Sequence, residues 1–518
     1  MIARRLSLVA GALALTAGAC SSSDSDTSDD PAATTTIITG TTEPGTTPPS
    51  STGTRGTETD DPSASGEVDV FDASVVHDIS ITFDQADYDA MLASYRDTGE
   101  KEWMEATVTI DGQTFERVGL RLKGNSSLAG LGGRGPGGGG RPDAGNDETT
   151  GTVADPPQGG GGGLPEFGGA SADSPQDLPW LIRLDEYVEG QTYQGYEDFV
   201  VRSNNSETAL NEAVSLALLD EAGLASQEAI ATRFSVNGSD AVLRLVVEHP
   251  DDDQWYETWF DGNGTLYKAE STGDWSYRGD DPASYEEVFD QEGGSEIADL
   301  TPLIDFLQFI NESDDATFAA ELPERLDVDA FATYLAMMEL IGNFDDIDGP
   351  GNNAYLWWDA ATEQFTIVPW DMNLSLGSGM GGPGGGLPGG GGFPGGRGGP
   401  PDGTLPEGME PPGGTLPEGM EPPGGSLPEG VEPGQGGFPG GGFGGRSNPL
   451  VERFLANDEF NALYERRLAE LEEQLVTSGT ADTILAGWVE VLTTQAGDVV
   501  AADVVESEAS SIREFLTG

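Results

Sequence analysis

The chain is poor in the residue types that build several common kinds of site. Its 518 residues include one cysteine, Cys20, and two histidines, His77 and His249. An intrachain disulfide and a cysteine-rich zinc site are therefore excluded, and a zinc centre or a hydrolase built on several histidines is not expected. His249 stands between Glu248 and Pro250, a setting that predicts a surface or turn position.

Basic residues are also scarce. Lysine and arginine number 23 against 91 aspartates and glutamates, which gives a formal net charge of −68. Such a chain lacks the basic surface that nucleic acid phosphates require, so we expect no nucleic acid partner. Most of the acidic residues are expected to serve solvation, although excess carboxylate also favours divalent cations.

The N-terminus has the pattern of a secretory signal peptide. Arg4 and Arg5 precede an apolar stretch that is too short to span a membrane. Small residues then lead to Cys20, as in a bacterial lipoprotein cleavage site. We therefore predict a signal peptide over residues 1–20, with Cys20 as the lipidated residue. The protein is expected to be extracytoplasmic, either attached to the membrane at the cell surface through a lipid anchor only, or secreted.

Low-complexity segments divide the rest of the chain. Residues 21–66 have almost no large apolar side chain and are predicted to form a disordered linker. Two further segments rich in Gly and Pro, 129–177 and 377–447, are predicted to be disordered insertions. They interrupt a folded region over 67–505, which is long enough for two lobes without them. Residues 506–518 are expected to form a C-terminal tail.

The folded region shows both strand and helix patterns, which predicts a mixed α+β fold. Asp111-Gly112 and Asn237-Gly238 each separate two apolar runs and indicate β-hairpins. Apolar residues at helical spacing predict helices over 211–221 and 328–341, the second ending at Gly342. A similar stripe from 460 to 475 predicts a packed helix.

The segment from Gly342 to Leu376 is the strongest candidate for chemistry. A polar loop holds Asp345, Asp348 and Asn353, and a predicted hairpin then leads to Asp371. Antiparallel pairing brings the two ends of that hairpin together. Phosphoryl transfer requires such a set: one carboxylate to accept a proton, and a carboxylate and an amide oxygen to hold a metal ion. An acidic turn that caps a hairpin explains the same spacing, whereas the ligand pattern of an EF-hand is incomplete.

A second motif runs from Val118 to Ser127. Alternating apolar residues predict a strand, so Arg121 and Lys123 share its other face, and the glycine-containing turn after it offers backbone N–H groups to an anion. A charged outer strand face is the ordinary explanation. However, the chain has only three lysines, Lys101, Lys123 and Lys268, and a lysine kept in an arginine-biased chain favours a phosphate site.

These motifs resemble the spore coat protein H (CotH) kinase family. The resemblance is carried by Asn-Phe-Asp at 343–345, Asn-Asn-Ala-Tyr-Leu-Trp at 352–357, Pro-Trp-Asp at 369–371 and Arg-Leu-Lys-Gly-Asn-Ser-Ser at 121–127. It covers about residues 70–376 and 449–503. It implies an atypical, two-lobed protein-kinase-like fold with mixed sheets and a helical C-terminal part. It also implies transfer of the ATP γ-phosphate, with Mg²⁺ (or Mn²⁺ or Ca²⁺), to Ser or Thr of an unnamed protein acceptor.

The resemblance implies a role for each matching residue. Asp345 is the expected catalytic base, with Asp348 as the alternative, and Asn353 and Asp371 are the expected metal ligands. The expected nucleotide-binding residues are Arg121, Lys123, Glu248, Lys268 and Trp370. For Glu248 a structural salt bridge remains an alternative, and for Trp370 core packing. The alternative for the whole protein is a non-catalytic CotH-like protein of adhesion or coat assembly, because long tethers suit display on a surface.

Overall fold

In the part of the chain that the structure describes, seven strands close into a barrel. The structure is a computed structural model, and it describes residues 68–131, 170–260, 263–271, 273–294, 299–343, 345–349, 352–378 and 448–518. The barrel order is β1-β2-β3-β4-β5-β7-β6, with β1 parallel to β6 and all other neighbours antiparallel. The strands are β1 (Val76–Phe83), β2 (Met104–Ile110), β3 (Gln113–Leu122), β4 (Trp180–Arg183), β5 (Asp198–Val201), β6 (Ala229–Val236) and β7 (Val242–Val247).

The two predicted hairpins are confirmed in this barrel. Asp111 and Gly112 join β2 to β3, and Asn237 and Gly238 join β6 to β7. All four residues have positive φ, between 48° and 85°. Type I′ turns need positive φ at both central positions, and their twist matches that of the paired strands. Side chains alternate along the strands, so those on one face of each strand fill the barrel. There they pack against the buried side chains of α1 (Gln85–Thr98).

A second sheet has four antiparallel strands in the order β11-β10-β8-β9. Its strands are β8 (Gly264–Ala269), β9 (Phe289–Gly293), β10 (Ala354–Asp359) and β11 (Gln364–Pro369). Tyr355 lies opposite Lys268, and Lys268 lies opposite Asp290. Directly opposite residues of antiparallel strands project to the same face. These three side chains therefore share one face of the sheet.

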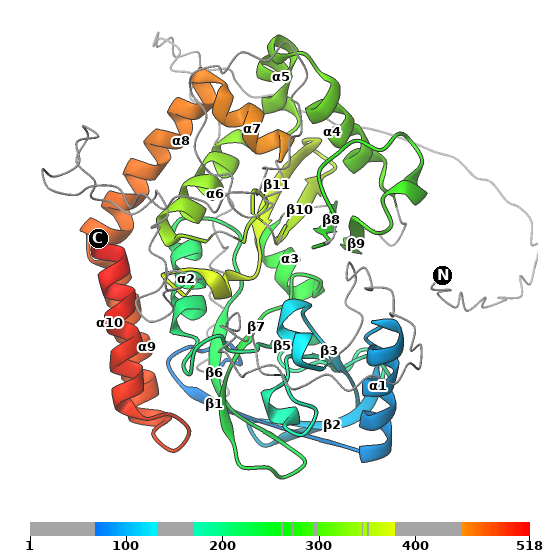
Figure 1. Cartoon of the computed structure of the whole chain (residues 1–518), viewed down its shortest axis with the longest axis vertical. Helices are drawn as coiled ribbons and strands as arrows, with labels where there is room; N and C mark the ends of the chain where they lie inside the picture. The colour runs from blue at the N-terminus through cyan, green and yellow to red at the C-terminus, as the bar shows by residue number, and fades with distance from the viewer. Residues whose placement is uncertain are drawn as a thin grey trace, which may run out of the picture. The chain divides into compact units, whose positions relative to one another are not determined.

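Most of the helices lie around the second sheet, and the last two of the chain lie together at one side (Figure 1). They are α2 (Leu210–Glu221), α3 (Asp253–Trp259), α4 (Thr301–Glu312), α5 (Asp315–Glu321), α6 (Val328–Ile341), α7 (Pro449–Ala456), α8 (Asp458–Leu471), α9 (Thr480–Gln495) and α10 (Ala502–Thr517). α6 contacts both β11 and α8, while α9 and α10 pack as a pair against α2.

Helix α6 has the bounds that the sequence predicted. The side chain of Asp327 accepts a hydrogen bond from the amide of Ala330 at its start, and Gly342, with a φ of 63°, ends it. Glycine adopts this left-handed conformation without the steric cost that a Cβ imposes. The stripe predicted from 460 onward lies in α8 and in the π-helix Glu472–Thr477 that follows it, where Phe460, Leu471 and Leu475 are buried.

The predicted mixed α+β fold class is thus confirmed. Residues 506–518, expected to be a tail, lie mostly within α10. The signal peptide with Cys20, the linker and most of both predicted insertions lie outside the described residues. Of the helices that the structure describes, none is both long enough and apolar enough to cross a bilayer.

A buried histidine links the first strand to the turn between β2 and β3. His77 Nδ1 lies 2.7 Å from Asp111 Oδ2, and the other carboxylate oxygen of Asp111 accepts a hydrogen bond from the amide of Asp78 at 2.9 Å. Burial by itself lowers the pKa of His77, but the hydrogen bond and charge of Asp111, with a smaller effect of Asp72, outweigh it. The pKa of His77 is therefore raised above 6.5.

This pair predicts a pH-dependent contribution to stability. Since the pKa of His77 is higher in the folded than in the unfolded chain, the stabilisation is complete below pH 6.5 and is lost as pH rises through the folded-state pKa. His77→Gln should therefore lower the free energy of unfolding more at pH 6 than at pH 9 in urea titrations. A difference from the parent protein that does not change with pH would contradict this account.

Candidate functional site

The hairpin of β10 and β11 places two predicted metal ligands at the same end of the sheet. Ala354 pairs with Pro369, so Asn353 directly precedes this pair and Asp371 follows it two positions later, after Trp370. Asp371 has a φ of 65°, a left-handed conformation that is uncommon for a residue with a side chain. It turns the chain into the short 3-10 helix η6 (Met372–Leu374). The predicted juxtaposition of the hairpin's two ends is present.

Asp345 and Asn353 contact each other directly. The amide nitrogen of Asn353 donates to the carbonyl oxygen of Asp345 at 2.8 Å and to its carboxylate at 3.0 Å. Asp348, the alternative base, is exposed further along the loop, and its backbone amide donates to Asp346 at 3.0 Å. Of the two carboxylates, Asp345 is thus the one that the structure joins to a predicted metal ligand.

Asp371 is held by a buried arginine rather than by Asn353. Its carboxylate forms an ion pair with Arg202, and the Nε of Arg202 lies 2.8 Å from Glu212 Oε1. Arg202 directly follows β5, and Glu212 lies in the first turn of α2. Burial raises the pKa of Glu212 to about 7 against the opposing charge of Arg202. This cluster joins the barrel, α2 and the hairpin end.

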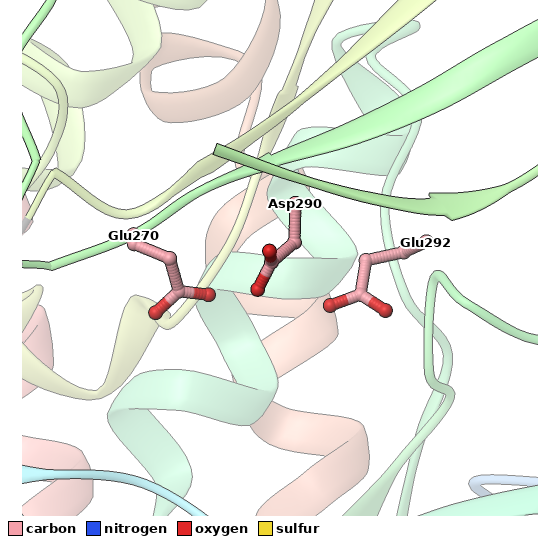
Figure 2. A group of neighbouring side chains, drawn as sticks. All are labelled: Glu270, Asp290 and Glu292. Atoms are coloured by element: carbon pink, nitrogen blue, oxygen red, sulfur yellow. The ribbon is translucent and has the colours of Figure 1, made fainter. Parts of the chain in front are cut away.

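Lys268 lies in an acidic environment on β8. It forms an ion pair with Glu270, and both Asp290 and Glu292 are close to Glu270 (Figure 2). Burial opposes its charge, but Glu270 and Glu292 outweigh that effect and raise the pKa of Lys268. Lys268 is therefore a fully charged ammonium group at neutral pH.

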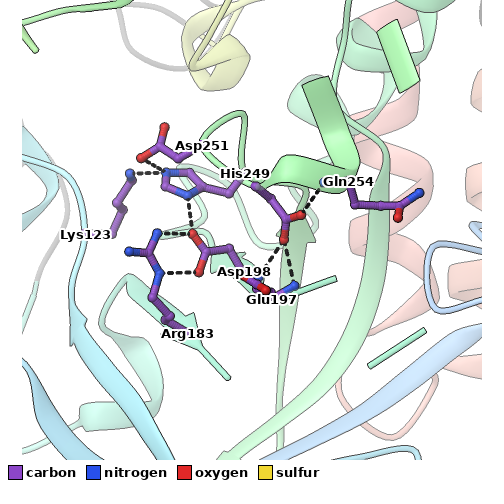
Figure 3. A network of polar contacts seen from close by, with 8 residues as sticks. Lys123, Arg183, Glu197, Asp198, His249, Asp251 and Gln254 are labelled. Atoms are coloured by element: carbon purple, nitrogen blue, oxygen red, sulfur yellow. Dashed lines mark hydrogen bonds and ion pairs between the residues drawn. The ribbon is translucent and has the colours of Figure 1, made fainter. Parts of the chain in front are cut away.

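His249 is the centre of a buried polar network (Figure 3). Its Nδ1 lies 2.8 Å from Asp198, which also accepts two hydrogen bonds from Arg183 at 2.8 and 2.6 Å. On the other side of the ring, Nε2 lies 2.6 Å from the Nζ of Lys123 and 3.3 Å from Asp251. Burial lowers the pKa of His249, so the ring is neutral at pH 7, donating from Nδ1 and accepting at Nε2.

The predicted surface position of His249 is therefore wrong, whereas the predicted turn is present, since the carbonyl of His249 accepts a hydrogen bond from the amide of Asp252 at 3.0 Å. The side chain is fully buried, because Lys123, directly after β3, and Asp198 of β5 satisfy its two ring nitrogens. Lys123 is separated from it by 126 positions in the chain. The local sequence around His249 contains no signal of that contact.

Trp370 packs between the cationic side chains of this region. The centroid of one of its rings lies 5.7 Å from Lys123 Nζ and 5.7 Å from the guanidinium carbon of Arg202. Tyr355 meets it edge to face at 5.6 Å. With 7 % of its surface exposed, Trp370 has the contacts of a core residue, and stacking on adenine stays a prediction.

Two other expected nucleotide-binding residues have partners of their own. Arg121 stacks on Trp103, with its guanidinium carbon 4.6 Å from the ring centroid. Glu248 is buried and accepts a hydrogen bond from the backbone amide of Glu228 at 2.6 Å. These contacts fix both side chains in place, and their roles toward a nucleotide stay predictions.

Lys101 is a site residue that the sequence reasoning missed. Its Nζ donates to Asn125 at 2.8 Å, and Asn125 in turn donates to Ser271 at 2.9 Å, next to the partner of Lys268. Burial, followed by the charges of Lys123 and Lys268, lowers the pKa of Lys101 to about 7. All three lysines of the chain therefore gather in one place. The scarcity of lysine in the chain, which indicated a phosphate site at Lys123, equally indicated Lys101.

Comparison with known proteins agrees with the motifs. The family model described as CotH kinase protein matches residues 166–497. The chain belongs to this family. Inner spore coat protein H of Bacillus subtilis (strain 168) is 23% identical over 201 residues, which are 38% of this chain and 54% of that protein. The chain thus spans about half the length of this curated relative. The CotH match includes His249, Lys268 and the β10–β11 hairpin and starts after Lys123.

The buried network of this CotH-family chain predicts a large cost for one small change. Asp198→Asn leaves Arg183 without its carboxylate partner and His249 without a charged acceptor. Breaking a buried pair from one side typically costs about 3–5 kcal/mol, so the free energy of unfolding in urea should fall by about that amount. Arg117→Gln, which breaks an exposed ion pair with Glu105, should cost under about 1 kcal/mol. Equal losses in the two variants would contradict the assignment.

Proposed function

We propose that this CotH-family chain is a kinase that transfers the γ-phosphate of ATP to Ser or Thr of a protein acceptor at the cell surface. The observation that carries the proposal is the arrangement at the open end of the β10–β11 hairpin. Asn353 lies just before β10 and is hydrogen-bonded to Asp345, and Asp371 lies just after β11. Lys268 belongs to β8 of the same sheet, and Lys123 lies over the ring of Trp370, which precedes Asp371. In this proposal, the barrel and the four-stranded sheet with its helices are the two lobes of a kinase-like fold.

Asp345 suits the role of general base. Hydrogen bonding to Asn353 holds its carboxylate in one orientation beside this predicted metal ligand, as acceptance of a hydroxyl proton requires. Asp348 is exposed and lies outside this contact. The geometry therefore favours Asp345 over Asp348, and an acceptor hydroxyl group is expected to approach Asp345.

The donor set at the hairpin end fits a hard divalent cation. Asp371 offers carboxylate oxygens, and the bond to Asp345 uses the amide nitrogen of Asn353 and leaves its oxygen to accept. Carboxylate and amide oxygens suit Mg²⁺ or Mn²⁺. Such an ion, when bound, neutralises the charge of the phosphates. Arg202 holds Asp371 in position at this end of the hairpin.

The three lysines suit the phosphates of ATP. Burial is the main reason that the pKa of Lys101 falls to about 7 and that of Lys123 to about 8. A lysine with a lowered pKa lacks sufficient counter-charge, and a bound polyphosphate supplies it. Nucleotide binding should therefore raise these pKa values and take up protons.

One observation favours the non-catalytic alternative. The carboxylate of Asp371 is already engaged by Arg202, as expected of a structural ion pair in a coat or adhesion protein. The two functions differ in what Asp371 does: in a kinase its removal abolishes turnover, whereas in a scaffold its removal affects stability alone.

The first test is labelling by γ-labelled ATP with Mg²⁺ or Mn²⁺, using the purified full chain and casein as acceptor. Asp345→Asn should lower kcat by about 10²–10⁴-fold, as expected for loss of a general base, and Asp371→Asn by at least about 100-fold. Asp348→Asn, in the same loop, is the matched control and should retain activity within about threefold. Labelling of neither the chain nor casein, together with no metal-dependent nucleotide binding, would overturn the proposed kinase.

A second test uses the titration of the lysines. Since Lys101 and Lys123 lose their charge near pH 7 and 8 in the free protein, the affinity for ATP should fall as pH rises from 7 to 9. Lys101→Ala should weaken binding at pH 7 by about tenfold, which corresponds to one charge-assisted hydrogen bond. Lys101→Arg keeps its charge and should show a smaller pH effect. Calorimetric Kd values that are the same for all three proteins would exclude Lys101 from the site.

A further inference from the structure

Helix α10 begins after residue 497, the last residue that the CotH family model matches. The helix packs against α9 and α2 (Figure 1). Two of its side chains reach the segments that carry the candidate site. Glu508 contacts the turn before α2, and Phe515 lies against two glycines on either side of the β10–β11 segment. The family match assigns α10 no role, so its contacts must indicate one.

The carboxylate of Glu508 accepts four hydrogen bonds from the turn at residues 206–208. Its Oε1 accepts from the backbone amide of Glu207 at 2.9 Å. Its Oε2 accepts from the hydroxyl of Ser206 at 2.8 Å, from the hydroxyl of Thr208, and from the amide of Thr208 at 3.3 Å. Hydrogen bonds to an ionised acceptor are stronger than neutral ones, so this one side chain fixes the whole turn.

The two hydroxyl groups extend this order into the start of α2. Ser206 Oγ accepts a hydrogen bond from the amide of Ala209 at 3.0 Å, and Thr208 Oγ1 accepts one from the amide of Leu210 at 3.2 Å. Each hydroxyl thus donates to Glu508 and accepts from the helix, and such linked bonds strengthen one another. Ala209 has a left-handed φ of 54°, a conformation that persists only where its surroundings hold it.

The start of α2 in turn holds the backbone that follows Asp371. Asn211 Nδ2 donates to the carbonyl oxygen of Asn373 at 2.6 Å, and Asn205 Nδ2 donates to the same oxygen at 3.4 Å. Glu212, the next residue of α2, binds the arginine that holds the carboxylate of Asp371. Residues 205–212 therefore lie between the carboxylate of α10 on one side and the segment of Asp371 on the other.

Phe515 gives α10 a second contact with the same region. A Cβ atom at Gly342 would lie 2.6 Å from its ring, and one at Gly377 would lie 3.4 Å from it, so the ring rests on both glycines. Gly342 ends α6 just before the loop of the candidate base. Next to the two glycines, the amide of Leu376 donates to the carbonyl oxygen of Ile341 at 2.7 Å. The helix thus supports the chain both before and after the hairpin.

We propose that Glu508 is a positioning residue that holds Asp371 in place for metal binding, through the turn at 206–208 and the start of α2. The inference deepens the proposed function and rests on it, because Asp371 is a metal ligand only in that proposal. Glu508 acts through other residues and not on the metal itself. Without its charge, Asp371 is in the binding arrangement for a smaller fraction of the time, and the apparent metal affinity falls by that fraction.

The first measurement is the Mg²⁺ dependence of casein labelling by the full chain. Glu508→Gln keeps the size of the side chain but turns an NH₂ group toward the donors at 206–208. It should raise the Mg²⁺ concentration for half-maximal labelling about tenfold, the size of effect seen when a group that orients a metal ligand is lost. Labelling at saturating Mg²⁺ should stay within about threefold of the parent, because bound metal restores the arrangement. Glu508→Asp keeps the charge and should recover part of the affinity.

The matched control is Glu506→Gln, because Glu506 is exposed on the same helix. This variant should keep the Mg²⁺ dependence of the parent. A smaller amount of folded protein lowers labelling equally at every Mg²⁺ concentration and leaves the half-maximal concentration unchanged. The shift in Mg²⁺ dependence therefore distinguishes positioning from a loss of stability.

Hydrogen exchange measured by mass spectrometry tests the same link without turnover. In Glu508→Gln, peptides that cover residues 206–213 should exchange at least about tenfold faster, as the loss of one charge-assisted hydrogen bond predicts. Peptides that cover 371–377 should also exchange faster, because the start of α2 holds that segment. Peptides of β1 and β2 should exchange as in the parent protein, since the barrel strands lie outside this link.

Failure of this inference can be told apart from failure of the proposed function. An active parent whose Mg²⁺ dependence is the same in Glu508→Gln, or shifts equally in Glu506→Gln, overturns the positioning role and leaves the kinase. A parent that labels neither casein nor itself overturns the kinase. In that case faster exchange at 371–377 still supports the link from Glu508 to the segment of Asp371, and faster exchange confined to 206–213 overturns it.

Discussion

The buried guanidinium of Arg202 is the interaction on which the geometry of the site depends. It connects the end of β5 with Glu212 of α2 and with Asp371 after β11. Removal of either acidic partner leaves the buried guanidinium with less counter-charge, and such a change costs several kcal/mol. Arg202 therefore holds the side chain of Asp371, whose backbone is left-handed. The preceding residue, Trp370, lies between Arg202 and Lys123.

The acidic composition of the chain makes the environment of Lys101 and Lys123 unusual. With 23 basic residues against 91 acidic ones, a buried cation readily finds a carboxylate, as Arg183 does with Asp198. Lys101 and Lys123 nevertheless have lowered pKa values, chiefly because of burial. Clusters of buried groups with shifted pKa values are typical of functional sites. An anionic ligand would offset the cost of burying these two lysines.

Features that depend on a few neighbouring residues were predictable from the sequence. The hairpin turns at Asp111 and Asn237, the bounds of α6 and the pairing of β10 with β11 follow from turn chemistry, capping and alternation. The nearness of Asn353 to Asp371 also follows, because the hairpin places both at one end.

Features that depend on distant pairing were not predictable. Lys123 meets His249 across 126 positions, and Arg202 meets Asp371 across 169. No local pattern distinguishes a histidine before proline at a surface from one buried against two charged partners. Lys101 is an intermediate case, since its rarity was visible in the sequence but its position beside Asn125 was not.

The arrangement around Asp371 also bears on how one side chain could serve both stability and the metal binding that we propose. Arg202 has two acidic partners, so if an ion takes one oxygen of Asp371, the guanidinium keeps Glu212 at 2.8 Å. The cost is then smaller than that of breaking an isolated buried pair. The side chain of Asp371 is 27 % exposed, whereas that of Glu212 is 4 % exposed. The two carboxyl groups are therefore not equivalent: Glu212 is enclosed with the arginine, and Asp371 has access to a ligand from solvent.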